Sequence, residues 1–224
     1  MDSHDAANWQ MASWSNGNPF ANTWQADNVS FNNGLMTLTL DNNGCPKSCD
    51  NKPYASGEYR TMQEIFSQGY YEARIKFAEG NGLVSGTFFT YRGTYGKLDH
   101  DEVDIEALGK DCAKIQTNYY VEGKGGHEEM ISLGFNGCKD FHNYGFKLSG
   151  QDLTWFIDGK AVRTVTASPA IKLPYRPAKI MANFWAGTSE VKGWLNGPFK
   201  YVKPLDVQYD WIRYSTLTGS EAKP

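Results

Sequence analysis

The residues from 100 to 108, HDEVDIEAL, hold the pattern in this chain that is best suited to catalysis. Alternate side chains of a β-strand point to opposite faces. The segment therefore places Glu102, Asp104 and Glu106 on one face and the apolar Val103 and Ile105 on the other. Like charges on alternate residues repel, and acidic residues are poor strand formers. A purely structural surface gains nothing from such a row, whereas a chemical role explains it.

The spacing of the two glutamates indicates one kind of bond cleavage. Cα atoms four residues apart on a strand are separated by about 13 Å, and two Glu side chains each reaching inward by about 4 Å leave about 5 Å between carboxyl groups. Glycosidases that retain configuration need about 5–5.5 Å, and inverting ones need a wider gap. In a partly dry cleft the three carboxyl groups resist ionising together, so one pKa rises and a proton stays available for general-acid catalysis.

Two other interpretations of the acidic row stay open at this point. The first is an ordinary solvated sheet face, where acidic residues are common. The second is a calcium or magnesium site, since rows of carboxylates also bind hard cations. Such sites usually take ligands from a flexible loop that wraps the ion, and this segment reads as a regular strand.

Strand-like segments recur along the chain with Gly, Asn, Asp and Pro between them, and none shows convincing helical periodicity. They are residues 34–40, 69–78, 83–91, 101–109, 113–121, 128–135, 144–149, 153–160, 161–167, 179–187 and 207–215. So many short strands predict an all-β fold, a concanavalin A-like β-sandwich of the jelly-roll type with two curved antiparallel sheets. The 224 residues fit one catalytic domain, residues 1–224.

The composition excludes several classes of partner. The 22 basic and 25 acidic residues give a net charge of −3, and no basic run is present, so neither nucleic acid nor an anionic membrane is an expected partner. No stretch approaches the roughly 20 apolar residues of a membrane-spanning helix, and the start MDSHDAANW lacks the features of an export signal. Aromatic residues make up 14% of the chain, which suits the apolar faces of sugar rings, although a sandwich core also uses them.

The four cysteines allow three pairings if two disulfides form. A zinc site is disfavoured because no C-x-x-C unit is present. The hairpin formed by residues 113–121 and 128–135 turns near Gly125, which pairs residues whose numbers sum to about 250, as those of Cys112 and Cys138 do. We therefore expect that disulfide, with a one-residue slip of register allowed. Cys45 and Cys49 then either close a small disulfide loop or stay as free thiols.

At this point the chain resembles a known family. HDEVDIEALGKD is similar to the signature of family-sixteen glycoside hydrolases, and specifically of the bacterial 1,3-1,4-β-glucanases called lichenases. Further similar segments follow in the family's order over nearly the whole chain: SNGNPFANTWQADNVSF, GEYRT, GYYEARIKFA, VSGTFFTY, KIQTNYYVEGKGGHEEMISLGF, FHNYGF, WFIDGK, KIMANFWAG and YDWIRY. Such collinearity is far more specific than one motif.

The resemblance implies a jelly roll whose concave sheet forms an open glucan cleft. It implies Glu102 as nucleophile, Glu106 as acid/base and Asp104 as their electrostatic neighbour. It also implies sugar contacts from residues along the cleft, namely Asn16, Phe20, Glu58, Arg60, Tyr91, Asn118, Tyr120, Asn183 and Trp185. Simpler explanations exist for some of these: the strand aromatics could be core residues, and Glu58 with Arg60 could be a surface ion pair of little energetic value.

Two departures from the family pattern are visible. The lichenases often carry Trp directly before the Asp-Glu pair, where this chain has His100, as plant xyloglucan endotransglycosylases do. The disulfide expected in bacillary forms falls on Asn22 and Ser56, so any covalent bracing is this protein's own. The resemblance further implies a structural calcium ion, with Asp210 and the carbonyl of Gly34 as ligands.

The expected function is endo-acting, retaining hydrolysis of β-1,4 bonds in mixed-linkage 1,3-1,4-β-D-glucans such as lichenan and barley β-glucan, with no cofactor for catalysis. Xyloglucan-type transglycosylation and non-catalytic glucan binding remain alternatives. The hairpin and the residues 179–187 resemble lichenases rather than the plant enzymes, and a lectin has no use for a protonated Glu beside an ionised one. We expect a secreted monomer whose partner is the β-glucan polysaccharide.

Overall fold

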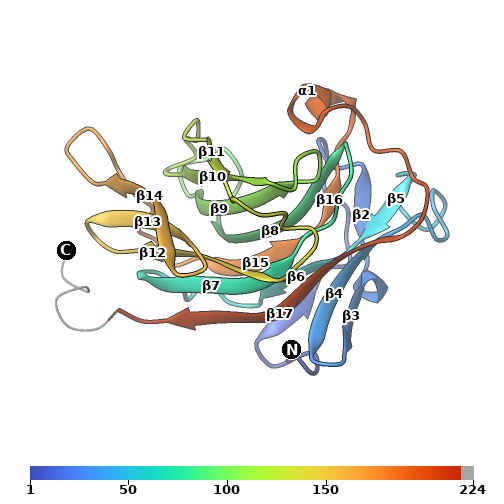
Figure 1. The fold of residues 1–224 in the computed structure, drawn as a ribbon, viewed down its shortest axis with the longest axis horizontal. Coiled ribbons are helices and arrows are strands. Elements are labelled where there is room, and N and C mark those ends of the chain that lie inside the picture. Colours follow the sequence, from blue (N-terminus) through green and yellow to red (C-terminus); the bar gives the residue numbers. More distant parts are fainter. Residues whose placement is uncertain (218–224) are drawn as a thin grey trace.

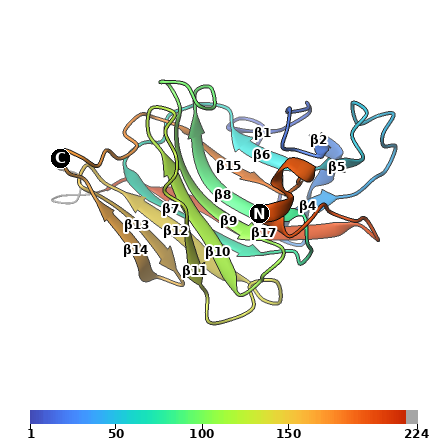
Figure 2. The same cartoon turned by 90° about the horizontal axis from the view of Figure 1, so that it is seen from above.

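A computed structural model describes residues 1–217 of the chain. Two large antiparallel sheets lie face to face and form a β-sandwich, and both sheets are visibly curved (Figures 1 and 2). The jelly-roll prediction is confirmed. The predicted domain also included residues 218–224, which lie outside the described residues.

The first sheet carries the acidic segment. Its strands, in spatial order, are β1 (Trp9–Met11), β6 (Glu58–Thr61), β15 (Lys179–Asn183), β8 (Leu83–Arg92), β9 (Asp101–Leu108), β10 (Lys114–Tyr120) and β11 (Glu129–Ser132), with β16 (Trp185–Ala186) paired to β8. β9 therefore lies inside the sheet with a hydrogen-bonded neighbour on each side. A strand in this position is held rigidly along both edges.

The second sheet supports the first from behind. Its strands, in spatial order, are β14 (Lys160–Thr166), β13 (Asp152–Ile157), β12 (His142–Leu148), β7 (Gly69–Lys76), β17 (Leu205–Ser215), β4 (Leu35–Leu40) and β3 (Val29–Asn32). The sequence LMTLTL of β4 shows how the pattern produces the strand, since Met36, Leu38 and Leu40 are fully buried and the residues between them are not.

The remaining elements are short. β2 (Asn22–Trp24) and β5 (Tyr54–Ser56) form a separate parallel pair, and the helical pieces are η1 (Ala26–Asn28), η2 (Ser189–Val191) and the single turn α1 (Lys192–Leu195). The helix ends at Asn196, which adopts the left-handed conformation (φ 61°) that Asn tolerates better than most residues. Among residues 1–217 no helix is long and apolar enough to cross a membrane.

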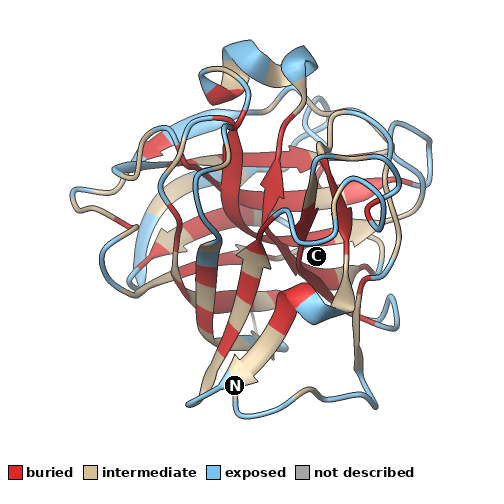
Figure 3. Ribbon diagram, turned by 90° about the vertical axis from the view of Figure 1, so that its right-hand side faces the viewer, coloured by how far each residue is buried: buried red, intermediate tan, exposed pale blue. Residues whose placement is uncertain are grey.

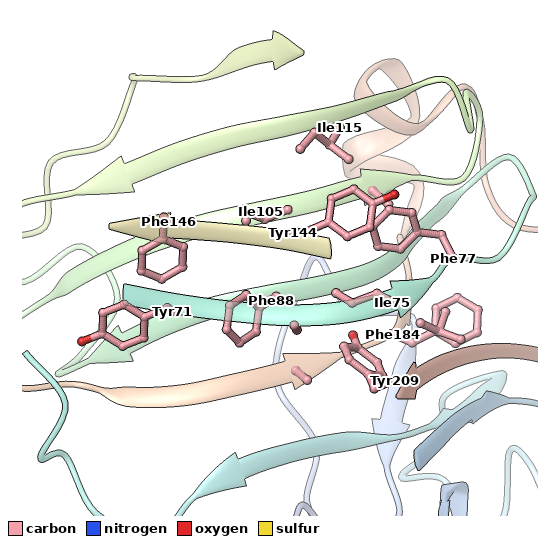
Figure 4. Close-up of a cluster of buried hydrophobic side chains, with 14 of the residues drawn as sticks. Tyr71, Ile75, Phe77, Phe88, Ile105, Ile115, Tyr144, Phe146, Phe184 and Tyr209 are labelled. Atoms are coloured by element: carbon pink, nitrogen blue, oxygen red, sulfur yellow. The ribbon is translucent and has the colours of Figure 1, made fainter. Parts of the chain in front are cut away.

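The core fills the space between the two sheets (Figures 3 and 4). It is rich in aromatic side chains, and labelled members such as Tyr71, Phe88, Tyr144 and Phe146 interleave from both layers. Full burial of one large apolar side chain contributes about 1.5–3 kcal/mol. Much of the aromatic content of the sequence is therefore explained by packing rather than by sugar binding.

Two buried aromatic side chains also bond to the backbone of the first sheet. The indole Nε1 of Trp155 on β13 donates to the carbonyl of Asp104 at 3.0 Å, and the hydroxyl of Tyr209 on β17 donates to the carbonyl of Thr87 at 2.7 Å. Both donors are fully buried. A donor left without a partner there would cost about 1–3 kcal/mol. These bonds hold β8 and β9 at a fixed distance from the second sheet.

The expected disulfide Cys112–Cys138 is present, and Cys45 and Cys49, for which two outcomes were open, form a disulfide as well. The hairpin register that led to Cys112–Cys138 is wrong, however. β10 and β11 pair Lys114 with Ser132, four residues away from the predicted register. The bond still forms because the chain after β11 turns back, and the amide of Gly137 donates to the carbonyl of Cys112 at 2.8 Å. The Cα atoms of Cys112 and Cys138 are 5.6 Å apart.

Candidate active site

The acidic row lies on β9 in the first sheet. Val103 and Ile105 are at most 1% exposed and face the core, as their alternation predicts. Glu102 and Glu106 are half-buried, and Asp104 between them is 4% exposed. The row is therefore not a solvated sheet face. It is a partly desolvated surface that keeps its two outer carboxyl groups within reach of a ligand.

Strand pairing surrounds each acid with side chains of β8 and β10, because directly opposed residues of an antiparallel pair point to the same face. The three rows across the sheet are Tyr91–Glu102–Tyr120, Phe89–Asp104–Asn118 and Thr87–Glu106–Gln116. Tyr91, Tyr120 and Asn118 thus lie directly beside the acidic row. Tyr91 and Tyr120 are half-buried and are not part of the core between the sheets.

The three acids share protons unequally. Burial raises the pKa of Glu102 to about 8, while a hydrogen bond with Asp104 acts in the opposite direction and the charge of Glu106 adds to the rise. Burial raises the pKa of Asp104 well above its usual range, and the charge and hydrogen bond of Glu102 add to it. Asp104 is thus the donor in this pair, and Glu102 is the acceptor that its neighbour helps to ionise.

Glu106 is placed to keep a proton. Burial raises the pKa of Glu106 well above its usual range, followed by the charges of Asp104 and Glu128. Glu128 lies just before β11, and its carboxylate accepts a bond from the amide of Asn118 at 3.4 Å. A protonated Glu106 near an ionised Glu102 is the division of labour that acid-catalysed bond cleavage requires.

His100 lies directly before β9 and contacts the first acid of the row. Its Nε2 is 2.5 Å from Oε2 of Glu102, and its side chain is fully buried. The ring lies 4.8–5.3 Å from those of Tyr91, Tyr95 and Tyr120. The sequence identified His100 as a departure from the family without assigning it a contact.

A buried polar cluster lies on the side of β8 that faces away from β9, where β15 and β6 pair. The amide of Asn183 donates to Glu58 Oε2 at 3.2 Å, and its oxygen accepts from the hydroxyl of Thr87 at 2.7 Å. Glu58 is 3% exposed, so its 3.8 Å pair with Arg60 is not a surface ion pair. The guanidinium of Arg60 lies over the ring of Trp14 at 4.1 Å.

Aromatic rings gather near the Glu106 end of the row. Phe20 and Trp185 have centroids 4.6 Å apart, and Trp185 is 5.9 Å from Trp194. The Trp194 indole donates to the side-chain oxygen of Gln116 at 2.9 Å, which joins this group to the row of Glu106. These rings form a second, smaller apolar cluster apart from the core between the sheets.

Asn16 lies in the loop before β2. Its backbone carbonyl, rather than its side chain, makes the contact seen in the structure. The ammonium of Lys52 donates to the carbonyls of Asn16, Phe20 (2.9 Å) and Asn22 (3.2 Å). Lys52 therefore holds the loop together, and this loop carries two of the predicted sugar contacts, Asn16 and Phe20. The structure gives no sugar-facing contact for the Asn16 side chain.

Sequence reasoning missed several members of the site. Strand alternation from Tyr91 and Asn118 could have found Thr87, Phe89 and Gln116, since each lies two or four residues along the same face. Nothing in the pattern could have placed Trp194, because it belongs to the single turn α1. Lys52 follows the small disulfide loop and carries no periodic signal.

Two hollows lie elsewhere on the molecule. One of about 370 Å³ is lined by Glu122, Lys172 and Tyr175 among others, and one of about 260 Å³ by Asp5 and Trp9 among others. Each contains a single carboxylate. Neither offers the carboxyl pair that the β9 row provides, so the row remains the candidate site for chemistry.

The expected calcium ligands are brought together in part. The carbonyls of Gly34 and Asp210 both accept hydrogen bonds from the ammonium of Met1, the second at 2.8 Å, so they converge on one positive charge. The Asp210 carboxylate instead pairs with Arg74 at 2.6 Å. Among the described residues no group of three or more His, Cys, Asp or Glu is arranged to hold a metal. The carbonyls fit a hard cation, and the carboxylate is already paired.

Two carboxyl groups that flank one bond are the requirement of a glycosidase, and this sandwich presents them on a single rigid strand. The family model for glycosyl hydrolases family 16 matches residues 16–213. The chain therefore belongs to glycosyl hydrolase family 16.

Named relatives agree with this family. A β-glucanase of Paenibacillus macerans is 43% identical over 210 residues, which are 93% of this chain and 83% of that protein. A β-glucanase of Acetivibrio thermocellus is 42% identical over 94% of this chain, and the chain spans only 59% of its length. The crystal structure of a 1,3-1,4-glucanase (lichenase) from a mouse hindgut metagenome superposes with a TM-score of 0.86 at 37% identity, covering 96% of both chains.

Proposed function

We propose that the protein is an endo-acting glycoside hydrolase that cleaves β-1,4 bonds in mixed-linkage 1,3-1,4-β-D-glucans with retention of configuration. The observation that carries the proposal is the row of Glu102, Asp104 and Glu106 on one face of β9. The hydrogen bond of Asp104 lowers the pKa of Glu102 against its burial, and burial raises the pKa of Glu106 well above its usual range. The choice of glucan rests on the relatives, which are named β-glucanases or a lichenase.

The mechanism follows from these roles. Glu106 protonates the glycosidic oxygen while the carboxylate of Glu102 attacks the anomeric carbon, which breaks the bond to the leaving sugar and forms a glycosyl ester. Glu106, now ionised, takes a proton from water, and the resulting attack on the anomeric carbon releases Glu102. Asp104 stays protonated and stabilises the carboxylate that forms at Glu102 before and after the ester.

The neighbouring side chains support binding of a chain of sugars. Tyr91 and Tyr120 flank Glu102, whereas Phe20 and Trp185 lie towards Glu106. Apolar ring faces at both ends suit the faces of successive glucose units. Asn118, Asn183, Glu58 and Arg60 supply donors and acceptors for sugar hydroxyls between them. Asn16 remains a proposed contact on resemblance alone.

The test combines substrate choice with one variant. Lichenan, barley β-glucan, laminarin and xyloglucan are incubated with the protein, and new reducing ends are counted with and without an acceptor oligosaccharide. We expect rapid cleavage of the two mixed-linkage glucans and no acceptor dependence. Glu102→Gln should keep the far-ultraviolet circular dichroism spectrum and lose activity by several orders of magnitude. Near-normal turnover by this variant, or cleavage of xyloglucan only with acceptor, would refute the proposal.

We further propose that the protein acts outside the cell as a monomer and carries a structural calcium ion near Gly34 and Asp210. Two disulfides support an oxidising compartment. Melting temperature in calcium against a chelator tests the ion, which would only stabilise the fold: a rise with calcium supports it, and equal values argue against it. Size-exclusion chromatography with light scattering tests the monomer.

A further inference from the structure

Every polar atom of His100, in the backbone and in the ring, has a hydrogen-bond partner. Its backbone N–H donates to the carbonyl of Lys97 at 3.0 Å, and its own carbonyl accepts from the amide of Gly123 at 2.8 Å. In the ring, Nδ1 accepts from the amide of Gly96 at 3.3 Å, and Nε2 lies 2.5 Å from the carboxylate of Glu102. Because both the backbone and the ring are bonded and the side chain has no exposed surface, the ring is fixed in one position.

These contacts determine which ring nitrogen carries the proton. The Gly96 amide can only donate, so Nδ1 must be the bare acceptor. Glu102 can only accept when ionised, so Nε2 must carry the hydrogen. The ring is thus the neutral Nε2–H tautomer. A doubly protonated ring would set two N–H groups against each other at Gly96.

The surroundings favour the same neutral form. Burial lowers the pKa of His100, and the charges of Asp101 and Asp99 oppose this without contacting the ring nitrogens. The rings of Tyr91, Tyr95 and Tyr120 pack around the imidazole, and Glu102 completes the set of titratable neighbours. Gly96 allows the close loop because its φ of +73° is a conformation that glycine adopts without strain.

We propose that His100 is a positioning residue for Glu102: its Nε2–H bonds to Oε2 and so fixes the orientation of the carboxylate that attacks the sugar. The proposal rests on the proposed role of Glu102 as nucleophile. His100 keeps its proton through the whole cycle. Its bond is strongest to a carboxylate and weaker to the glycosyl ester, so it also stabilises Glu102 as a leaving group in the second step.

Three variants test this role. His100→Phe keeps a buried ring and removes the donor, and His100→Gln restores an N–H near the Nε2 position. His142→Phe is the matched control, because His142 also pairs with a carboxylate, that of Asp158 at 2.8 Å, but on the second sheet. For His100→Phe we expect kcat to fall about tenfold to hundredfold with KM nearly unchanged, the size of one hydrogen bond to a charged group.

The acid limb of the pH profile of kcat/KM shows whether His100 positions Glu102 or only fills space. Loss of a donor to a carboxylate raises its pKa, so the acid limb of kcat/KM should move to higher pH in His100→Phe. His100→Gln should return both kcat and the limb most of the way, and His142→Phe should match the parent protein. An unchanged kcat and limb in His100→Phe would overturn the proposal, as would equal losses in both His100 variants with a normal limb.

A measurement on the parent protein, independent of activity, tests the proposal even if a His100 variant does not fold. Nitrogen-15 NMR of histidine-labelled parent protein reports the tautomer, and the His100 signal is assigned by its loss in His100→Gln. We expect the neutral Nε2–H form from pH 5 to pH 8. A protonated Nδ1 in this range would overturn the inference. If Glu102→Gln proves fully active, the proposed function fails instead, and the NMR result still decides the tautomer.

Discussion

The carboxyl group of Asp104 donates a hydrogen bond to Glu102, its neighbour two residues earlier on the same face of β9. The two groups are therefore unequal, although both are buried among acids. The hydrogen bond raises the pKa of Asp104 and lowers that of Glu102, against the effect of burial on Glu102. Glu106, at the far end of the row, has no such hydrogen bond among the causes of its shift, and burial raises its pKa well above its usual range.

This inequality predicts the response to loss of the general acid. Glu106→Ala should hydrolyse β-glucan slowly but still react with a substrate that has an activated aryl leaving group, because that bond needs no protonation. Azide should accelerate the second step and yield a β-glycosyl azide. The alkaline limb of kcat/KM should disappear, since Glu106 sets it. Absence of rescue, or a persistent alkaline limb, would indicate a different acid.

The same burial predicts a stability cost at neutral pH. A carboxyl group whose pKa is raised by folding contributes stability that is fully present below its unfolded pKa, about 4.3 for Glu, and that is lost as pH rises through the folded pKa. Glu106→Gln removes this titration. Its melting temperature should exceed that of the parent by a margin that grows from pH 4 to pH 8. A constant or shrinking margin contradicts the raised pKa.

Lys52 should affect substrate binding more than chemistry. Its ammonium joins the carbonyls of Asn16, Phe20 and Asn22, and it is far along the chain from the acidic row. Lys52→Met should loosen this loop and raise KM for β-glucan several-fold, with a smaller effect on kcat. Lys47→Met, at an exposed position in the preceding disulfide loop, is the control. A fall in kcat at constant KM would show that the loop serves the chemistry directly.

The two disulfides should differ in their contribution to stability. Cys112–Cys138 spans 26 residues and Cys45–Cys49 only 4. In the chain-entropy account these loops correspond to about 3.5 and about 2 kcal/mol. Replacing the first pair by alanine should lower the free energy of unfolding more than replacing the second, as measured by denaturant titration. The reverse order would mean that local packing outweighs loop closure here.

The sequence predicts much of the fold because most strands are long enough to show alternation. LMTLTL and DEVDIEAL reveal their buried faces directly. The strands β1, β2, β3 and β5 have three or four residues each and were missed, since alternation is not measurable over so few positions. The hairpin register was wrong because the tight turn lies at Glu122 and Gly123, bracketed by the Val121–Lys124 bridge, and not near Gly125.

The site is predictable to the extent that it lies on strands. The acidic row follows from spacing within one strand, whereas its cross-strand partners depend on the register between strands, which no single strand encodes. The contact between His100 and Glu102 also escapes a sequence argument. It needs the loop at Gly96 to cap the ring, and that closure is a tertiary event.

Trapping the glycosyl–enzyme tests the central claim most directly. A 2-deoxy-2-fluoro glucosyl-glucosyl fluoride should react with the protein once: the fluorine at C2 slows both steps, and the anomeric fluoride, a good leaving group, speeds only the first, so the glycosyl ester accumulates. Mass spectrometry of the digested protein should locate the added sugar on Glu102, and Glu102→Gln should take up none. A label on Glu106 or Asp104, or an unlabelled protein that inverts configuration, would contradict the assignment.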